Sequence, residues 1–257
     1  RTSTALMILA LREMGAQVEY LVPDRFKYGY GLTPAIADLA FTSFTPDLLI
    51  TVDNGISSHD GVKQAQDHGM QVIITDHHLT TKPTPRAQAV VNPNQLGCDF
   101  PSKALAGVGV AFYVLANLST YRKKLNKPSA VMSQYLDLVA LGTYADVASL
   151  DYNNRILVDV GLKRIQQHLC RPGISALLEI AGREAVTLKA QDLGFVLGPR
   201  INAAGRMETM DIGIECLLAQ DFASAYPLAE QLNQLNVERR QVEATMKQEA
   251  LIALDQI

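Results

Sequence analysis

Acidic and imidazole side chains directly follow two short apolar segments of this sequence. Asp53 follows the first segment, and Asp76, His77 and His78 follow the second. Carboxylate oxygen and imidazole nitrogen are common ligands of Mn²⁺, Zn²⁺ and Fe²⁺, and Mg²⁺ prefers carboxylates. Where a strand runs into a loop, one histidine of an adjacent pair can bind a metal ion while the other faces a substrate. The alternative is that the pair only caps the strand and the following loop.

Further polar residues suit phosphate chemistry. Asp146 lies in an apolar setting, LGTYADVA, where burial without a partner is costly; taken alone, a cap for the next segment is the alternative. Arg200, Asn202 and Arg206 lie among small residues in GPRINAAGRM, and arginine forks match phosphate oxygens. The alternative there is a loop whose arginines pair with surface acids. Lys103, just before the glycine-rich AGVGVA, is a further candidate for phosphate contact. Together these residues indicate metal-assisted phosphoryl chemistry.

The elements that position these residues alternate between strands and helices. Short apolar runs predict strands at residues 18–22, 47–52, 70–75 and 89–91. Helix signals predict helices at residues 2–14, with Thr2 or Ser3 as N-cap, and at 34–41 and 57–69. Strands joined by helices form a parallel sheet, and ligands bind at the carboxyl ends of its strands. A right-handed crossover would make the strands before Asp53 and Asp76 neighbours.

The second half of the chain is mainly helical by its pattern. Helices are predicted at residues 109–118, 130–141, 155–168, 174–181 and 190–197. Residues 198–207 are predicted to be a loop, and residues 223–257 a long charged helix.

Composition excludes several classes of protein. The chain is 48% hydrophobic with a formal net charge of -3, so it can bury a core and has no overall basic field for nucleic acid. Three dispersed cysteines argue against a disulfide framework and favour the reducing cytoplasm. The pattern shows neither a membrane span nor a secretory signal.

Five motifs in this order resemble the DHH phosphoesterase superfamily, and within it a branch of bacterial exonucleases specific for single-stranded DNA. The motifs are VDNG (52–55), DHH (76–78), LAGVGVAF (105–112), LGTYADV (141–147) and GPRINAAGRM (198–207). The resemblance implies an α/β fold: a DHH-type parallel β-sheet flanked by helices, followed by a helical region and a long C-terminal connector helix. Residues 1–222 would form the catalytic domain, with an α/β part to about residue 100 and a mainly helical part at 101–222. Residues 223–257 would be the connector helix toward a DHHA1-type domain.

The resemblance also implies a role for each site residue. Asp53 would bridge two Mn²⁺ or Mg²⁺ ions, His77 and Asp146 would be further metal ligands, His78 would face the scissile phosphate with Asp76 in support, and Arg200, Asn202 and Arg206 would hold the phosphates of the 5′ end. The implied activity is hydrolysis of single-stranded DNA from its 5′ end to 5′ mononucleotides, in DNA repair and recombination. The implied partners are single-stranded DNA, single-strand-binding protein and a RecQ-type helicase.

Two departures from the family pattern accompany these expectations. The family's T-S-x-A-L helix is present from Thr2 to Leu6, but the D-x-D strand that should precede it is not in this sequence. We therefore expect an internal fragment with an incomplete two-metal site, which also lacks the DHHA1-type domain. The alternative functions are a DHH-family oligoribonuclease or phosphatase, and a non-catalytic relative that binds single strands or proteins.

Overall fold

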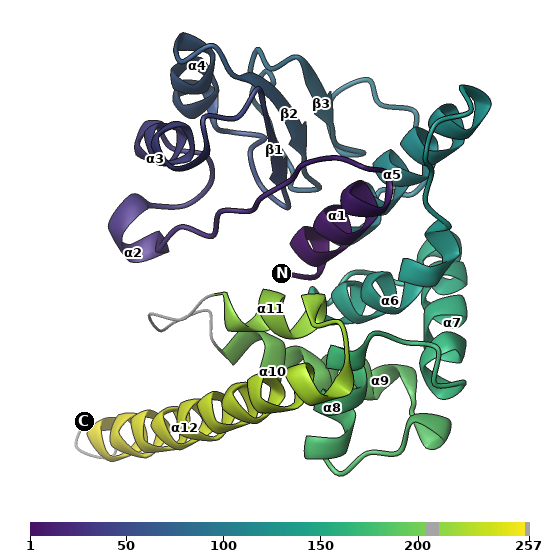
Figure 1. The fold of residues 1–257 in the computed structure, drawn as a ribbon. Coiled ribbons are helices and arrows are strands. Elements are labelled where there is room, and N and C mark those ends of the chain that lie inside the picture. The colour runs from purple at the N-terminus through teal and green to yellow at the C-terminus, as the bar shows by residue number, and fades with distance from the viewer. Residues whose placement is uncertain (204–210, 255–257) are drawn as a thin grey trace.

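Three parallel strands form the sheet of the protein, in the order β1-β2-β3 (Figure 1). The structure is a computed structural model that describes residues 1–203 and 211–254. The strands are β1 (Leu48–Val52), β2 (Gln71–Thr75) and β3 (Ala89–Val91). Val52 pairs with Thr75, which pairs with Val91, so all three strands end at the same level. The predicted sheet and the predicted neighbouring of the first two of these strands are thus confirmed.

Helices cover both faces of this sheet (Figure 1). On one face α3 (Pro34–Phe44) and α4 (His59–Asp67) pack against Val72 and Ile74 of β2. On the other face α1 (Thr2–Glu13) and α5 (Gly107–Lys124) belong to the larger core that Ile50 and Val52 of β1 contact. The alternation of apolar side chains along β1 and β2 produces this division, because successive side chains of a strand point to opposite faces.

A helical region continues the larger core below the sheet. Its helices are α6 (Leu136–Ala145), α7 (Tyr152–Gln166), α8 (Pro172–Ile180), α9 (Ala190–Asp192), α10 (Gly198–Ala203) and α11 (Ile212–Leu218). Three short helical turns also lie in this region: η1 (Met132–Tyr135), η2 (Ala185–Thr187) and the π-helical η3 (Leu193–Leu197). A further short helix, α2 (Arg25–Tyr28), precedes the sheet in the chain. The central helix is α6, whose residues 138–141 have no exposed surface.

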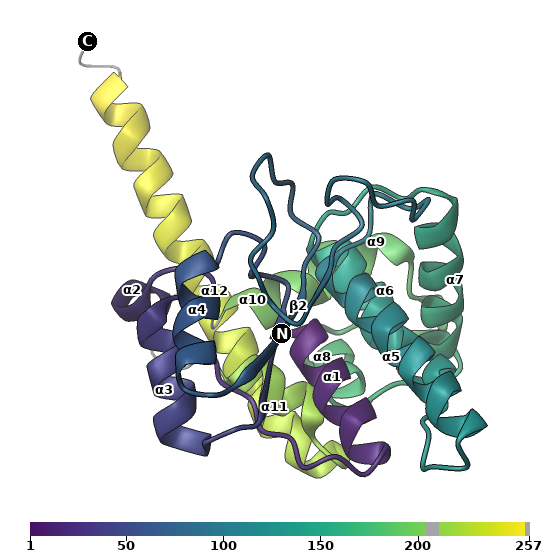
Figure 2. The same cartoon turned by 90° about the horizontal axis from the view of Figure 1, so that it is seen from above.

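The last helix, α12 (Phe222–Leu254), is the long C-terminal helix that the sequence predicts. Its first turns are buried through Ala225, Ala229 and Leu232, whereas Val242 and Met246 are exposed. Figure 2 shows its C-terminal half projecting away from the body of the domain.

Three local expectations are wrong. Residues 18–22 form no strand, because no neighbouring strand pairs with them in the described structure. Arg1, and neither Thr2 nor Ser3, is the N-cap of α1, and both of those residues lie buried inside the helix. Residues 198–203 form α10 where a loop is expected, because proline in a first helical turn is well tolerated. Residues 204–207 of that predicted loop lie outside the described residues.

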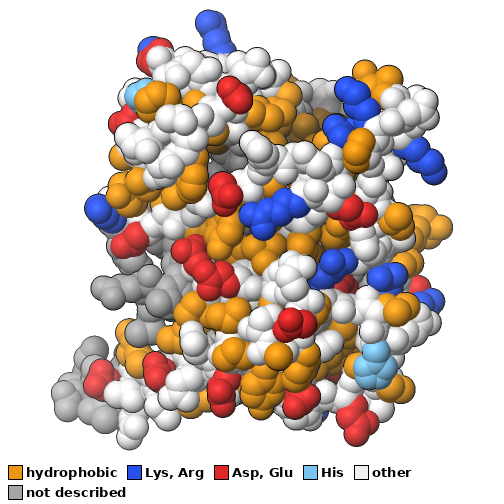
Figure 3. All heavy atoms as spheres, in the orientation of Figure 1, with side chains coloured by type: hydrophobic (Ala, Val, Ile, Leu, Met, Phe, Trp, Pro, Cys, Tyr) orange, Lys and Arg blue, Asp and Glu red, His pale blue; other side chains and the backbone are white. Residues whose placement is uncertain are grey.

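Charge is distributed without a dominant sign on the face shown in Figure 3. Acidic and basic side chains are interspersed there among the described residues, in keeping with the net charge of -3. None of the helices described is both long enough and apolar enough to cross a bilayer.

Candidate metal centre

Asp53 extends β1 by one residue and then turns the chain away. Its amide donates to Thr75 O at 3.0 Å, and its backbone takes the left-handed conformation with φ 64°. Aspartate tolerates this conformation better than most residues. The turn behind it is held by Asn54, whose side chain donates to Val52 O, and by Thr51, whose hydroxyl donates to Asn54 O. The carboxylate is therefore fixed at the carboxyl edge of the sheet.

The first turn of α5 packs directly against this carboxylate. A Cβ added to Gly107 would lie 2.2 Å from Asp53 Oδ1, so no side chain fits there. The N-terminus of α5 has no side-chain cap, and its positive dipole end faces a negative group. Gly107 is a site residue that sequence reasoning missed, although the AGVGVA segment signalled close packing.

Asp76 is buried and positions its neighbours. One carboxylate oxygen accepts from Ile56 N at 2.9 Å. The other accepts from the amides of His77 and His78 and from His78 Nδ1, the last at 2.6 Å. Burial alone would raise the pKa of Asp76, but these hydrogen bonds hold it below its usual value. Since Asp76 occupies Nδ1 of His78, Nε2 of this half-exposed ring is the nitrogen available to a ligand.

His77 joins the two carboxylates at the sheet edge. Its Nε2 lies 3.0 Å from Asp53 Oδ1 and 3.5 Å from Asp146 Oδ2. The closer pair is not aligned for a hydrogen bond, and both His77 Nε2 and Asp53 Oδ1 are buried without a hydrogen-bond partner among the described residues. Buried polar atoms are nearly always paired, so a His nitrogen and a carboxylate oxygen that face each other without a hydrogen bond suit a cation that both could bind.

Asp146 reaches this cluster from the end of α6, where it is the C-cap, so it does not cap the next helix. Burial raises the pKa of Asp146, with His77 opposing and Asp53 adding to the effect. Burial lowers the pKa of His77, but contact with Asp53 and the charges of Asp53, Asp146 and Asp76 outweigh it and raise the pKa. The shift of His77 reflects the clustered negative charge of these carboxylates, which a cation would neutralise, whereas the shift of Asp146 comes mainly from its burial.

These donors fit a divalent metal ion. Donor atoms on one edge of an octahedral Mg²⁺ site with bonds of about 2.1 Å lie about 3.0 Å apart. The separation of His77 Nε2 from Asp53 Oδ1 matches this value. Asp53, His77 and His78 each offer a ligand atom, and the three atoms lie within 4.8 Å of one another. The structure thus places a ligand atom of His78 beside those of Asp53 and His77, whereas the family resemblance predicted a phosphate contact for His78.

The side chains of two asparagines hydrogen-bond to the backbone carbonyls of His77 and His78. Neither asparagine was predicted from the sequence as a site residue. Asn92 Nδ2 donates to His78 O at 2.9 Å, and Asn94 Nδ2 donates to His77 O at 2.6 Å. The sequence Asn92-Pro93-Asn94 after β3 is typical of a turn, but nothing in it indicates what the side chains bind.

The predicted phosphate ligands lie in different surroundings. Asn202 lines a recess of about 90 Å³ together with Asp53 and Asp146. Arg200 donates to Asn233 of α12 and to Val196 O. Lys103 Nζ donates to the carbonyls of Pro93 and Cys98, at 2.7 Å and 2.6 Å. Arg206 lies outside the described residues.

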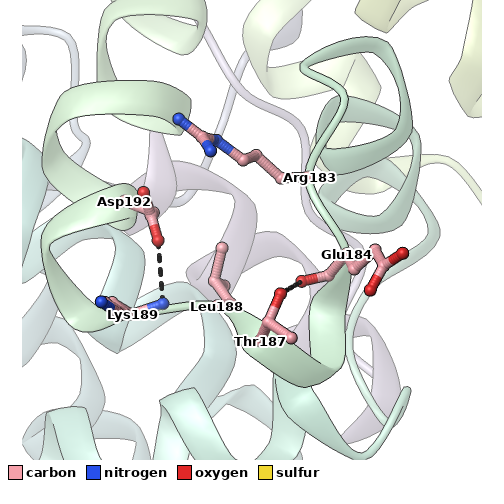
Figure 4. A pocket seen from close by; sticks show the side chains of 6 residues that line it. All are labelled: Arg183, Glu184, Thr187, Leu188, Lys189 and Asp192. Carbon is pink, nitrogen blue, oxygen red and sulfur yellow. Dashed lines mark hydrogen bonds between the residues drawn. The ribbon is translucent and has the colours of Figure 1, made fainter.

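A larger recess lies away from this cluster. It measures about 200 Å³ and is lined by Arg183, Glu184, Thr187, Leu188, Lys189 and Asp192 (Figure 4). Asp192 accepts from Lys189 N, and the Thr187 hydroxyl donates to Glu184 O, so these groups close the turns before α9. The recess beside Asp53 is smaller, but the donor set places the candidate site there.

The fold and the donors together define an α/β domain whose sheet edge carries a cluster of side chains suited to a divalent metal ion. A family model described as "DHH family, N-terminal domain" matches residues 1–143, which is more than half of the chain. The chain belongs to the DHH family.

Individual relatives agree with this assignment. The chain is 52% identical over 265 residues to the single-stranded-DNA-specific exonuclease RecJ of Dickeya dadantii, covering 100% of this chain and 46% of that protein. A crystal structure of exonuclease RecJ bound to manganese superposes with a TM-score of 0.86 at 35% identity, covering 98% of this chain and 62% of that one. A crystal structure of RecJ from Thermus thermophilus in complex with Mg²⁺ has a TM-score of 0.68 at 32% identity, with coverages of 96% and 31%. The chain therefore spans about half the length of the relatives it matches.

Proposed function

We propose that this chain is the catalytic part of a metal-dependent exonuclease that degrades single-stranded DNA from the 5′ end to 5′ mononucleotides, in DNA repair and recombination. The observation that carries this proposal is the pair of buried ligand atoms, Asp53 Oδ1 and His77 Nε2, which face each other 3.0 Å apart without a hydrogen-bond partner among the described residues. They lie in a chain that resembles RecJ over its whole length.

In this proposal Asp53, His77 and Asp146 hold Mn²⁺ or Mg²⁺ at the sheet edge, as part of a two-metal site. A bound metal ion supplies Lewis acidity toward the phosphodiester and lowers the pKa of water. Gly107 allows α5 to approach Asp53, and the dipole of α5 adds positive potential where phosphate oxygens would lie.

His78 faces the scissile phosphate in this proposal. Asp76 fixes its ring through Nδ1, so Nε2 can donate a proton or a hydrogen bond to a phosphate oxygen. Asp76 touches no substrate and acts as a positioning residue, since its hydrogen bonds among the described residues go to the backbone and to His78.

Arg200, Asn202 and Arg206 are proposed to hold phosphates, with Lys103 as a further contact. Support comes from Asn202 in the recess beside Asp53. Burial lowers the pKa of Arg200, and the positive charges of the nearby Arg240 and Arg183 lower it further. Within the described part of the chain, Arg200 makes no ion pair. Such grouped guanidinium groups favour an anion between them.

The remaining parts of the proposal concern context. Residues 1–222 would be the catalytic domain and residues 223–257 the connector helix. The protein would act in the cytoplasm, on single-stranded DNA, together with single-strand-binding protein and a RecQ-type helicase. Pull-down of these two proteins by the natural full-length protein tests the last point.

The central experiment uses the natural full-length protein with 5′-phosphorylated single strands and Mn²⁺. We expect mononucleotides to be released, chelator to stop the release, and His78→Ala to lower the rate by at least about 100-fold. His168→Ala is the matched control, because His168 lies just beyond the end of α7 and contacts none of the described site residues. Equal rates for His78→Ala and the parent would refute the proposal. Preference for strands of a few nucleotides over long ones would favour an oligonucleotidase instead.

A further inference from the structure

Six of the helices in the described part of the chain end with the same pair of backbone hydrogen bonds. The amide of a residue with positive φ donates to the carbonyl three residues earlier, and the next amide donates to the carbonyl five residues before it. The residues in the positive-φ position are Gly15, Gly69, Gly182, Asn126, His168 and, at the end of α6, Val147. Glycine and asparagine are the usual residues there. Val147 is the one β-branched residue of these six.

Valine is costly in this position. Its φ is 54°, and the left-handed conformation is strained for a residue with a Cβ, most for branched side chains. Thr45 also has positive φ, but it ends α3 through a different, single bond to Phe41 O. Three of the six ends show that glycine suits the same turn.

Burial does not offset this cost. Val147 is 88% exposed as a residue, so its side chain gains little from packing on the described residues. A strained residue with an exposed side chain indicates that something other than local packing requires the side chain.

The position of Val147 beside Asp146 indicates why a valine side chain is required there. It directly follows Asp146, whose Oδ2 lies 3.5 Å from His77 Nε2. Since successive Cα atoms are about 3.8 Å apart, the isopropyl group lies within about 10 Å of the Asp146 carboxylate. A nucleotide whose phosphate sits beside that carboxylate has its sugar within that range.

We propose that Val147 is a substrate-positioning residue whose isopropyl group packs against the sugar of the nucleotide beside the scissile phosphodiester. The proposal rests on the proposed function. An aliphatic group next to a metal site cannot bind phosphate, but it can cover the C–H face of a deoxyribose whatever base is attached. Contact of this kind would hold the phosphodiester in line with the metal donors and His78 without sequence preference.

The test compares Val147→Gly, Val147→Ile and His168→Gly in the natural full-length protein. His168→Gly is the matched control, because it relieves the same backbone conformation at the end of α7. The substrates are a 5′-phosphorylated single strand and bis(4-nitrophenyl) phosphate, a diester without sugar. We expect Val147→Gly to raise the KM for the strand about 10-fold, to hydrolyse the sugarless diester within about twofold of the parent, and to melt no lower than the parent. Val147→Ile should keep the parent KM, and His168→Gly should change neither substrate's kinetics.

Two results would overturn the inference alone: an unchanged KM for the strand in Val147→Gly, or an equal loss on both substrates with a lower melting temperature. The second result would show that Val147 packs inside the protein. If the parent itself releases no nucleotides with Mn²⁺, the proposed function fails, and the inference fails with it.

Discussion

Substitution of Gly107 by alanine tests how the metal ligands are held. The added Cβ would lie 2.2 Å from Asp53 Oδ1 and 2.7 Å from Asp53 Cβ. Gly107 is in the first turn of α5, whose neighbours Val108 and Val110 are buried in the core, so the helix cannot easily retreat. The carboxylate of Asp53 must move instead.

The size of the effect follows from these distances. Real Cβ atoms essentially never approach within 3.0 Å of such a neighbour, so the oxygen must retreat by about 0.8 Å. A metal ligand tolerates about 0.2 Å. We expect the affinity for Mn²⁺ to fall about 100-fold, the upper end for residues that orient metal ligands.

A thermal shift makes this loss measurable. A metal present at about 100 times its Kd stabilises the native state by about 2.7 kcal/mol, which is a shift of about 5–10 °C for a domain of this size. After a 100-fold loss of affinity the stabilisation is about 0.4 kcal/mol, or about 1 °C.

The assay is calorimetric titration with Mn²⁺, combined with melting curves with and without the metal. Gly109→Ala is the control in the same helix, because its Cβ would meet the movable end of the Leu105 side chain. We expect this control to bind Mn²⁺ as the parent does. If Gly107→Ala also binds Mn²⁺ with parental affinity while remaining folded, the geometric account of Asp53 is wrong.

Three further predictions concern the support of the site and of the sheet. Asp76→Ala should lower the free energy of unfolding in urea by about 2–4 kcal/mol, because it leaves buried amides unpaired; a loss below about 0.5 kcal/mol would contradict the role of Asp76. Asn94→Ala should weaken Mn²⁺ binding about 10-fold in calorimetry, because the backbone of His77 loses its support, and parental affinity would speak against this. His68 and Gln64 hydrogen-bond Asp38 and lower its pKa, so this stabilisation is present above the ordinary aspartate pKa and is lost as the pH falls through the lowered value. The difference in melting temperature between the parent and Asp38→Ala should therefore be largest near neutral pH and shrink below pH 3.8, and a difference that grows in acid would contradict this.

Much of the α/β part could be predicted from sequence because local signals and tertiary packing agree there. The strands that precede Asp53 and Asp76 are short apolar runs, and the Thr33-Pro34 start of α3 is capped by the Thr33 side chain as its sequence predicts. Residues 18–22 alternate like a short strand but have no strand beside them in the described structure. Alternation of apolar and polar residues indicates which side chains of a strand could be buried. The backbone hydrogen bonds of a strand come only from a neighbouring strand, which this alternation does not predict.

The site itself was only partly predictable. Parallel strands end at one edge, so Asp53 and the residues after β2 could be placed together from pattern alone. Asp146 is distant in sequence from Asp53 and His77 and lies at the end of α6. Only the family resemblance therefore predicted that it lies beside these two residues. Gly107, Asn92 and Asn94 act through one close approach and two backbone contacts, which depend on how α5 and the loop after β3 pack.

The most direct measurement is anomalous diffraction from crystals of the natural full-length protein grown with Mn²⁺. The account predicts a peak about 2.0–2.4 Å from Asp53 Oδ1, His77 Nε2 and an oxygen of Asp146. The same crystals of Asp53→Ala should lose this peak. No peak at saturating Mn²⁺, or a peak that none of these three side chains binds, would contradict the account.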